Sequence, residues 1–246
     1  MTPWHAALLV LAGIGAGLTG SVAGLASLIS YPALLAVGLP PVTANVTNTI
    51  ALVFSTIGSF VGSRPELEGQ GPQVRTLGGV GIAGGVVGGV LLLSTPAVWF
   101  ERIVPWLIGF GSLTILLPRR AAEVHTRDSP LFLAGVFAIG LYAGYFGAAA
   151  GVLMLALFLA VSSQTLARCN ALKNIVVGLA NAVAAVVFVV FGTVSWASAV
   201  PLAIGLYVGG RVGPAVVRHS PAPLLRVLIA ISGVAMAIYL GYKTYL

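Results

Sequence analysis

The residues of this sequence that could do chemistry are polar side chains inside long apolar runs. The segment NALKNIVVGLAN contains Asn170, Lys173 and Asn174, and the earlier segment TANVTNTI contains Thr47 and Asn48. Asn170 and Asn174 are four residues apart, so they share one face of a helix, and Asn181 extends that face about three turns further on. These side chains offer ammonium, amide and hydroxyl donors, and we expect them to bind an anion.

Structural roles compete with binding at the same residues. Amide and hydroxyl side chains commonly form hydrogen bonds between membrane helices. Lys173 lies five residues past Arg168, near enough to the end of its run that its ammonium could snorkel to the membrane surface.

Two glycine clusters stand before these polar segments. GLTGSVAGL begins at residue 17 and GYFGAAAGV begins at residue 144. Glycine is disfavoured inside helices, but it permits a tight turn and leaves backbone N–H groups uncovered. A helix broken near the membrane midplane can point its N-terminus at an anion. We therefore expect two substrate-facing tips, formed by Gly20, Ser21 and Gly24 and by Gly147, Ala149 and Gly151.

In each expected tip, the helix that follows the turn, called here the second limb, begins with a capped N-terminus. Ser21 would cap this limb in the first tip and leave the N–H groups of residues 22–24 free, and residues 149–151 would do the same in the second tip. The alternative for either cluster is close helix packing through a small-xxx-small motif. Packing is the expected role of two other glycine-rich segments, GGVVGG at 84–89 and GGRVG at 209–213.

The composition predicts a polytopic α-helical membrane protein. Of the 246 residues, 59% are hydrophobic and 7% are charged, and the mean hydropathy is +1.07. A soluble domain has about 25% charged residues. Apolar runs of about 20 residues, enough to cross a bilayer, follow one another along most of the chain. They do not alternate as the strands of a membrane barrel do.

The chain also contains an internal repeat. A shift of 127 residues superposes the two glycine clusters, with six of thirteen positions identical across residues 13–25. A shift of 125 matches six of fourteen positions across residues 84–97. Two matched blocks in the same order predict two homologous halves, residues 1–120 and 128–246, within a single membrane domain over residues 1–246.

The distribution of charge indicates that the halves are inverted. If each glycine cluster is the tip of a hairpin, ten of the twelve lysine and arginine residues lie on one side of the membrane, and only Arg102 and Lys243 lie on the other. If the clusters lie within single long helices, the split is six to six, which does not satisfy the positive-inside rule. We expect both termini outside and the loops at 64–75 and 118–130 in the cytoplasm.

Segment lengths favour the hairpins as well. Limbs 131–143 and 152–162 would be about 20 and 17 Å long, too short for a hydrocarbon core of about 30 Å. Limb 5–20 would be longer, about 24 Å, so hairpins and tilted spans are not distinguished. The expected fold is all-α, with two inverted repeats that each contain a glycine-tipped broken or re-entrant helix pair and three transmembrane helices.

The sequence shows no motif for catalysis or metal binding. The three histidines are scattered, and no GxSxG, HExxH or phosphate-binding loop is present, so we expect no enzyme activity, no metal and no cofactor. All five acidic residues lie in polar breaks, whereas a cation carrier or proton pump usually has a carboxylate within a span. The net charge of +7 comes from basic residues at segment ends, so it does not indicate nucleic-acid binding.

The order of these motifs resembles the TauE/SafE sulfite exporter family over essentially the whole chain. GLTGSVAG and GYFGAAAG precede the second limbs, TANVTNT and NALKN follow them, and GGVVGG and GGRVG close the halves. The resemblance implies a secondary transporter of the bacterial inner membrane, with relatives that handle sulfite, sulfonates such as sulfoacetate, and other small organosulfur anions. Ser21, Val22 and Ala23 stand where many relatives have a glycine-richer turn.

The expected function is export of sulfite or a small sulfonate by alternating access between the two halves. Its expected partners are a small inorganic or organosulfur anion and the lipid bilayer, and a homo-oligomer is left open. The alternatives are an uncoupled anion channel, an importer of another organosulfur anion such as thiosulfate, and a membrane assembly that transports nothing.

Overall fold

The computed structural model describes residues 2–116 and 129–219, together with residues 231, 234–235, 238–239 and 241–242. Within these residues the secondary structure is helical, as predicted, and contains no strand. In chain order the helices are α1 (Pro3–Ala23), α2 (Ser27–Ala36), α3 (Pro41–Gly62), α4 (Arg64–Leu67), α5 (Gly71–Ser94), α6 (Ala97–Leu116), α7 (Pro130–Tyr145), α8 (Ala150–Val161), α9 (Leu166–Phe191) and α10 (Trp196–His219). Most of the predicted last span and of the loop at 118–130 lies outside the described residues.

Five of the described helices are long and apolar enough to cross a membrane, so the protein is a multi-pass membrane protein. They are α1, α3, α5, α9 and the residues Trp196–Val217 of α10. Helices α2, α7 and α8 are apolar but have only 10, 16 and 12 residues. The predicted first limb stops near residue 20, whereas α1 continues to Ala23, because Gly24 adopts a left-handed conformation (φ 81°) that caps the helix there.

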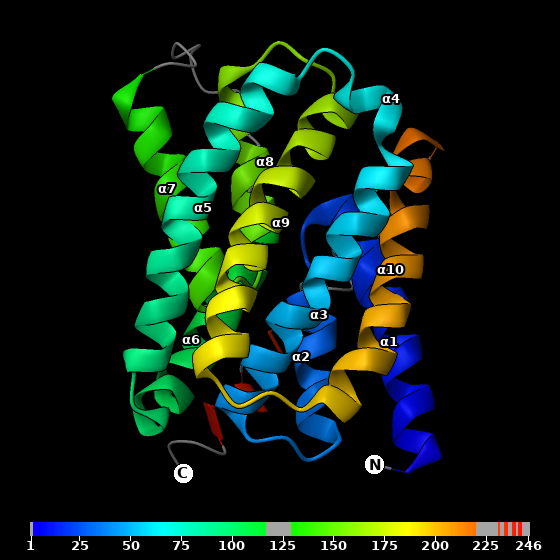
Figure 1. Ribbon diagram of the computed structural model, residues 1–246, viewed down its shortest axis with the longest axis vertical. Helices are drawn as coiled ribbons and strands as arrows, with labels where there is room; N and C mark the ends of the chain where they lie inside the picture. Colours follow the sequence, from blue (N-terminus) through cyan, green and yellow to red (C-terminus); the bar gives the residue numbers. More distant parts are fainter. Residues whose placement is uncertain are drawn as a thin grey trace.

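The helix pairs α1–α2 and α7–α8 enter the bundle from opposite ends (Figure 1). α1 rises from the N-terminal end, and α2 returns toward that end before α3 crosses to the opposite one. α7 enters from that opposite end, α8 returns to it, and α9 then crosses back. Opposite entry is what an inverted repeat requires, and the homology of the two halves stays a prediction.

The first limbs of the two pairs begin with the same sequence signal. Pro3 and Pro130 start α1 and α7, at positions where no N–H donor is needed. Thr2 and Ser129 precede them and accept hydrogen bonds from backbone N–H groups of the first turn. Thr165 caps α9 in the same way.

The glycine-rich helices α5 and α10 are each packed closely between two neighbours. A Cβ on Gly85 would lie 2.8 Å from the Ala180 Cα of α9, and a Cβ on Gly84 would meet the backbone of α7. α10 packs in the same way against α1 through Gly205 and against α3 through Gly210. Larger side chains would push these helices apart, so the glycines have the packing role that the sequence predicts. Each glycine-rich helix thereby packs against the first helix of the other predicted half.

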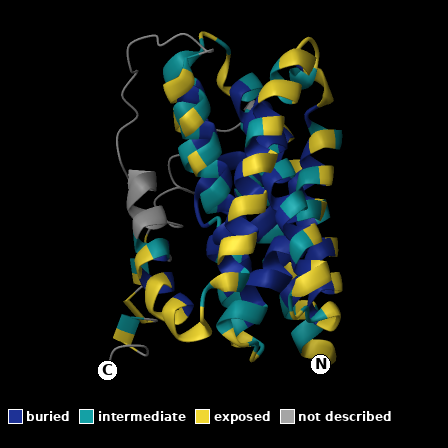
Figure 2. Ribbon diagram, turned by 60° about the vertical axis from the view of Figure 1, so that its left-hand side comes forward, coloured by how far each residue is buried: buried dark blue, intermediate teal, exposed yellow. Residues whose placement is uncertain are grey.

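The outside of the bundle is apolar. Figure 2 shows buried residues through the middle and exposed residues along the outer faces of the helices. Within the segment GGVVGG of α5, the four glycines are buried, whereas Val86 and Val87 are 37% and 45% exposed. Valines that face outward between inward-facing glycines are suited to contact with lipid.

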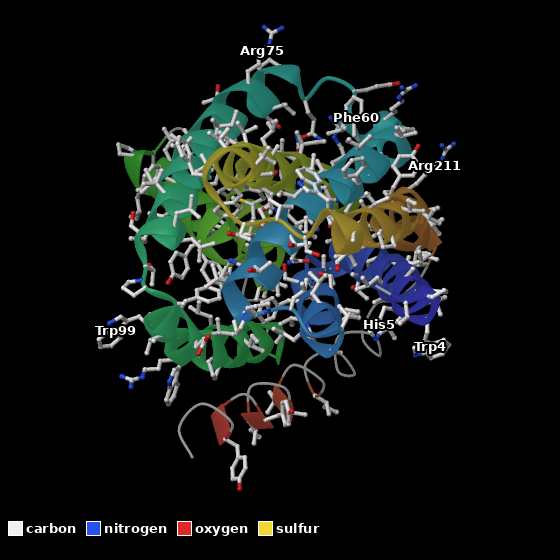
Figure 3. The ribbon with its side chains drawn as sticks, turned by 60° about the horizontal axis from the view of Figure 1, so that its bottom comes forward. Trp4, His5, Phe60, Arg75, Trp99 and Arg211 are labelled. Atoms are coloured by element: carbon white, nitrogen blue, oxygen red, sulfur yellow. The ribbon has the colours of Figure 1, made fainter. Side chains whose placement is uncertain are left out.

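All four tryptophans are exposed, and three of them begin helices at the same end of the bundle. Trp4, Trp99 and Trp196 lie in the first turns of α1, α6 and α10, and Trp106 lies two turns into α6. Figure 3 shows Trp4 and Trp99 pointing outward from the rim of the bundle. Tryptophan is enriched at membrane–water interfaces, so this end is suited to one surface of the membrane.

Candidate functional site

The two glycine-bearing tips meet in the interior of the protein. A Cβ on Gly24 would lie 2.5 Å from the Gly151 Cα, and a Cβ on Gly151 would lie 2.5 Å from the Gly24 Cα, so the two backbones are in contact. The same two glycines superpose on each other when the sequence is shifted by 127 residues. Contact between equivalent residues is what a two-fold axis between the predicted halves would produce.

The first tip differs from the sequence prediction. Ser21 does not cap α2, because it lies within α1 and its hydroxyl donates to the Leu18 carbonyl at 3.3 Å. The prediction that the N–H groups of residues 22–24 are free is wrong, because α1 continues through them to its Gly24 cap. The N–H groups without an acceptor in the described chain are instead those of residues 25–27, at the start of α2.

The second tip turns through residues 146–149, between α7 and α8. Gly147 has φ 72° and Ala149 has φ 61°, and Ala149 is the only non-glycine residue with a positive φ among those described. Ala150 donates its N–H to the Gly147 carbonyl at 3.1 Å, so the prediction that this N–H is free is wrong. The N–H groups of Ala149 and Gly151 donate no hydrogen bond within the described residues.

Polar side chains of α9 bind the carbonyl end of α1. Asn170 and Asn174 donate to the Ser21 carbonyl at 2.7 and 3.2 Å, and Lys173 Nζ donates to the Gly20 carbonyl at 3.2 Å. The Lys173 side chain is buried, with 1% of the residue exposed. These donors offset the partial negative charge that the C-terminus of a helix carries.

Helix α3 caps the second hairpin in a corresponding way. Asn45, which is not among the predicted binding residues, donates to the Tyr145 carbonyl at the end of α7, at 2.8 Å. Tyr142 also holds this tip, because its hydroxyl donates to the Ala148 carbonyl at 2.7 Å. Each polar helix thus supports the hairpin of the other predicted half.

A cavity of about 60 Å³ lies between the two tips, α3 and α9. This volume is enough for roughly four water molecules. Seven of the predicted binding residues line it, namely Gly20, Ser21, Gly24, Gly147, Gly151, Lys173 and Asn174. The structure therefore brings residues of both glycine clusters and of the lysine-bearing segment together around one small space.

Four predicted binding residues do not line this cavity. Ala149 is buried in the second tip, and Asn170 caps α1. Asn48 donates to the hydroxyl of Ser27, a residue that does line the cavity, at 3.2 Å. Thr47 accepts a hydrogen bond from the Ser195 N–H at 3.1 Å, in the connection between α9 and α10.

Sequence reasoning missed the hydroxyl groups of the cavity. Ser27, Ser55, Thr56 and Ser59 line it, together with Asn181. The available signal was the spacing of Ser55 and Ser59, which are four residues apart and so share one face of α3. Small hydroxyl residues are common where membrane helices pack, and that spacing alone does not single them out.

The cavity is rich in hydrogen-bond donors. Among the described residues that line it, none is acidic and Lys173 is the ionisable one. Glu66 and Glu101, which were expected in polar breaks, lie in α4 and α6 and are not part of the wall. Arg211 is exposed and points away from the bundle (Figure 3). No group of three or more metal-ligating residues occurs in the described chain.

Comparison with known proteins identifies membrane transporters. The family model described as Sulfite exporter TauE/SafE matches residues 9–240. "Probable membrane transporter protein YfcA" of Escherichia coli (strain K12) is 27% identical over 235 residues, which cover 94% of this chain and 87% of that protein. "Probable membrane transporter protein ORF9" of Sinorhizobium sp. is 28% identical over 242 residues, which cover 95% and 91%. No solved structure matches the chain.

The family match spans both tips, both polar helices and every residue that lines the cavity. Together with the five apolar helices long enough to cross a membrane, it assigns the protein to the membrane transporters. The chain belongs to the TauE/SafE sulfite exporter family.

Proposed function

We propose that the protein is a secondary transporter that exports sulfite or a small organosulfonate across the bacterial inner membrane. The observation that supports this function is the cavity between the tips. Its wall combines Lys173 and Asn174 with the start of α2, where the N–H groups of residues 25–27 have no acceptor among the described residues, and it contains no carboxylate. An anion stripped of water needs such donors in place of its hydration shell.

The charge of the site fits a small anion. The N-terminus of a helix carries roughly half a positive charge, and α2 and α8 both begin at the meeting tips. These two termini would balance about one negative charge. The ammonium of Lys173 adds a further positive charge, which suits a substrate with up to two negative charges.

Alternating access would use the two hairpins as gates. They enter from opposite ends of the bundle (Figure 1), and their tips meet through Gly24 and Gly151. Displacement of one hairpin would open the cavity to one end while the other hairpin still closes the opposite end. Transporters with inverted repeats work by such movements around a fixed central site.

The proposed orientation places the arginine-rich end in the cytoplasm and the termini outside. Arg64, Arg75 and Arg168 lie at the end of the bundle that carries α4 (Figure 1). Arg102 lies at the opposite end, beside Trp99. This difference follows the positive-inside rule.

The test is counterflow in proteoliposomes that contain the purified protein. Labelled sulfite should enter vesicles preloaded with unlabelled sulfite, and the initial rate should saturate, which protein-free vesicles would not show. Flux that rises without saturation would indicate a channel, and counterflow of thiosulfate without sulfite would indicate that the substrate is another organosulfur anion. Absence of any anion flux, and of any thermal stabilisation by these anions, would contradict the proposal.

A further inference from the structure

One amide in the cavity wall has no partner in the protein. Asn181 is 7% exposed, and its Oδ1 is buried without a hydrogen bond. Six buried side-chain oxygens in the described chain have no partner, and Asn181 alone among their residues lines this cavity. Because buried polar groups are nearly always hydrogen-bonded, an unpartnered amide on a cavity wall points to a ligand.

Ser55, on the facing helix, also offers a side chain that no other described side chain or carbonyl engages. It is 7% exposed, it lines the cavity, and its hydroxyl makes no hydrogen bond within the described residues. The other side chains of the wall are already engaged. Lys173 and Asn174 donate to carbonyls of α1, and Thr56 and Ser59 donate to backbone carbonyls at 3.4 and 3.3 Å.

Asn181 and Ser55 lie apart from the lysine. Asn181 is eight residues past Lys173 in α9, which corresponds to about 12 Å along the helix axis. Ser55 lines the same cavity as Asn181, and the helices that carry them, α3 and α9, cross where Thr56 meets Gly178. The cavity wall therefore has a lysine-bearing part and, further along α9, a neutral amide and hydroxyl part.

We propose that Asn181 and Ser55 form a second subsite, which accepts a hydrogen bond from the substrate while Lys173 and the start of α2 bind its anionic group. This inference rests on the proposed function and names the substrate class. The amide oxygen of Asn181 repels sulfonate oxygens but accepts a bond from O–H or N–H, and the hydroxyl of Ser55 can accept such a bond as well. Turning the amide by 180° leaves an acceptor in the same wall. The preferred substrate is a small sulfonate with a hydroxyl or ammonium group at its other end.

The test compares sulfonates that differ only in the donor. Binding of ethanesulfonate, 2-hydroxyethanesulfonate and 2-aminoethanesulfonate to the purified protein is measured by calorimetry. We expect the two donor-bearing anions to bind about tenfold more tightly than ethanesulfonate, which is the discrimination expected of one well-formed hydrogen bond.

Two variants test whether Asn181 and Ser55 cause the preference for donor-bearing sulfonates over ethanesulfonate. Asn181→Leu keeps the branched shape of the side chain and removes its acceptor, so the preference should disappear while ethanesulfonate still binds. Ser55→Ala should reduce the preference, and it decides the outcome if Asn181→Leu does not fold. Ser30→Ala is the matched control, because Ser30 is buried, donates to the Ala26 carbonyl of its own helix turn at 3.0 Å and does not line the cavity.

The outcomes separate the subsite from the function on which it rests. Equal binding of all three sulfonates by the parent protein, or a preference that survives in both variants, would overturn the subsite and leave anion transport standing. If neither the sulfonates nor sulfite bind, both proposals fail.

Discussion

Ala149 holds a backbone conformation that alanine normally avoids. Its φ of 61° lies in the left-handed region, which costs a residue with a side chain about 1–2 kcal/mol. The residue is fully buried in the second tip, where the following residues start α8. Strained backbone of this kind persists only where the surrounding structure fixes it.

A pair of glycine substitutions measures this strain. Ala149→Gly and Ala150→Gly each remove one fully buried methyl group and each add freedom to the unfolded chain. Only Ala149→Gly also relieves a left-handed conformation. We expect Ala149→Gly to be less destabilising by about 1–2 kcal/mol, measured from thermal midpoints in the same detergent. Equal losses of stability would show that the tip is not strained at Ala149.

Lys173 contributes charge to the cavity, and its substitution should affect anions according to their charge. Lys173→Met keeps the apolar stem and removes the ammonium. It should weaken binding of sulfoacetate, a dianion, at least about tenfold and weaken binding of ethanesulfonate, a monoanion, less, because helix N-termini alone supply only about one charge. Lys173→Arg should keep part of the affinity. Competition binding measures both effects. An equal loss of affinity for the two anions would mean that Lys173 only caps α1 and does not match the charge of the substrate.

At the scale of the helix pairs, the contact between the tips is the feature on which gating depends. Gly24→Ala and Gly38→Ala both place alanine at a positive φ, 81° and 93°. A Cβ at Gly38 meets nothing within 4 Å, whereas a Cβ at Gly24 collides with the backbone of Gly151. We expect Gly24→Ala to lose most counterflow activity and Gly38→Ala to retain most of it. Similar activity of the two variants would contradict a role for the contact in transport.

The tips also show where prediction from the sequence stops. The glycine clusters indicate a break in the helix, and Gly20, Gly24, Gly147 and Gly151 do lie at the tips. The cap at Ser21 is wrong because Gly24 ends α1, and the backbone of Gly24 packs against a residue 127 positions later in the chain. Local sequence carries no information about that contact.

At the scale of the whole molecule, orientation in the membrane can be tested with single cysteines. In a Cys169→Ala background, Glu68→Cys and Val98→Cys place exposed thiols at opposite ends of the bundle. An impermeant maleimide added to intact cells should label Val98→Cys at once and Glu68→Cys only after the membrane is permeabilised. The reverse pattern would contradict the proposed topology.

The membrane class, the helix content and the packing role of GGVVGG and GGRVG could be predicted from the sequence, because they depend on local pattern and residue size. The hydroxyl part of the cavity could not, because Ser55 and Ser59 resemble packing residues until α3 is placed against α9. The same holds for Asn45, since the carbonyl that it binds is exposed only where α7 ends.

The close packing of α1 against α10 has a consequence for how the protein is made. α1 ends at Ala23 and α10 begins at Trp196, so about 170 residues are synthesised between them. At about 5–20 residues per second, this takes roughly 10–35 s. During that time α10 does not yet cover the glycine-lined face of α1 in the bilayer. A ribosome that stalls before α10 therefore leaves this face in contact with lipid instead of with α10.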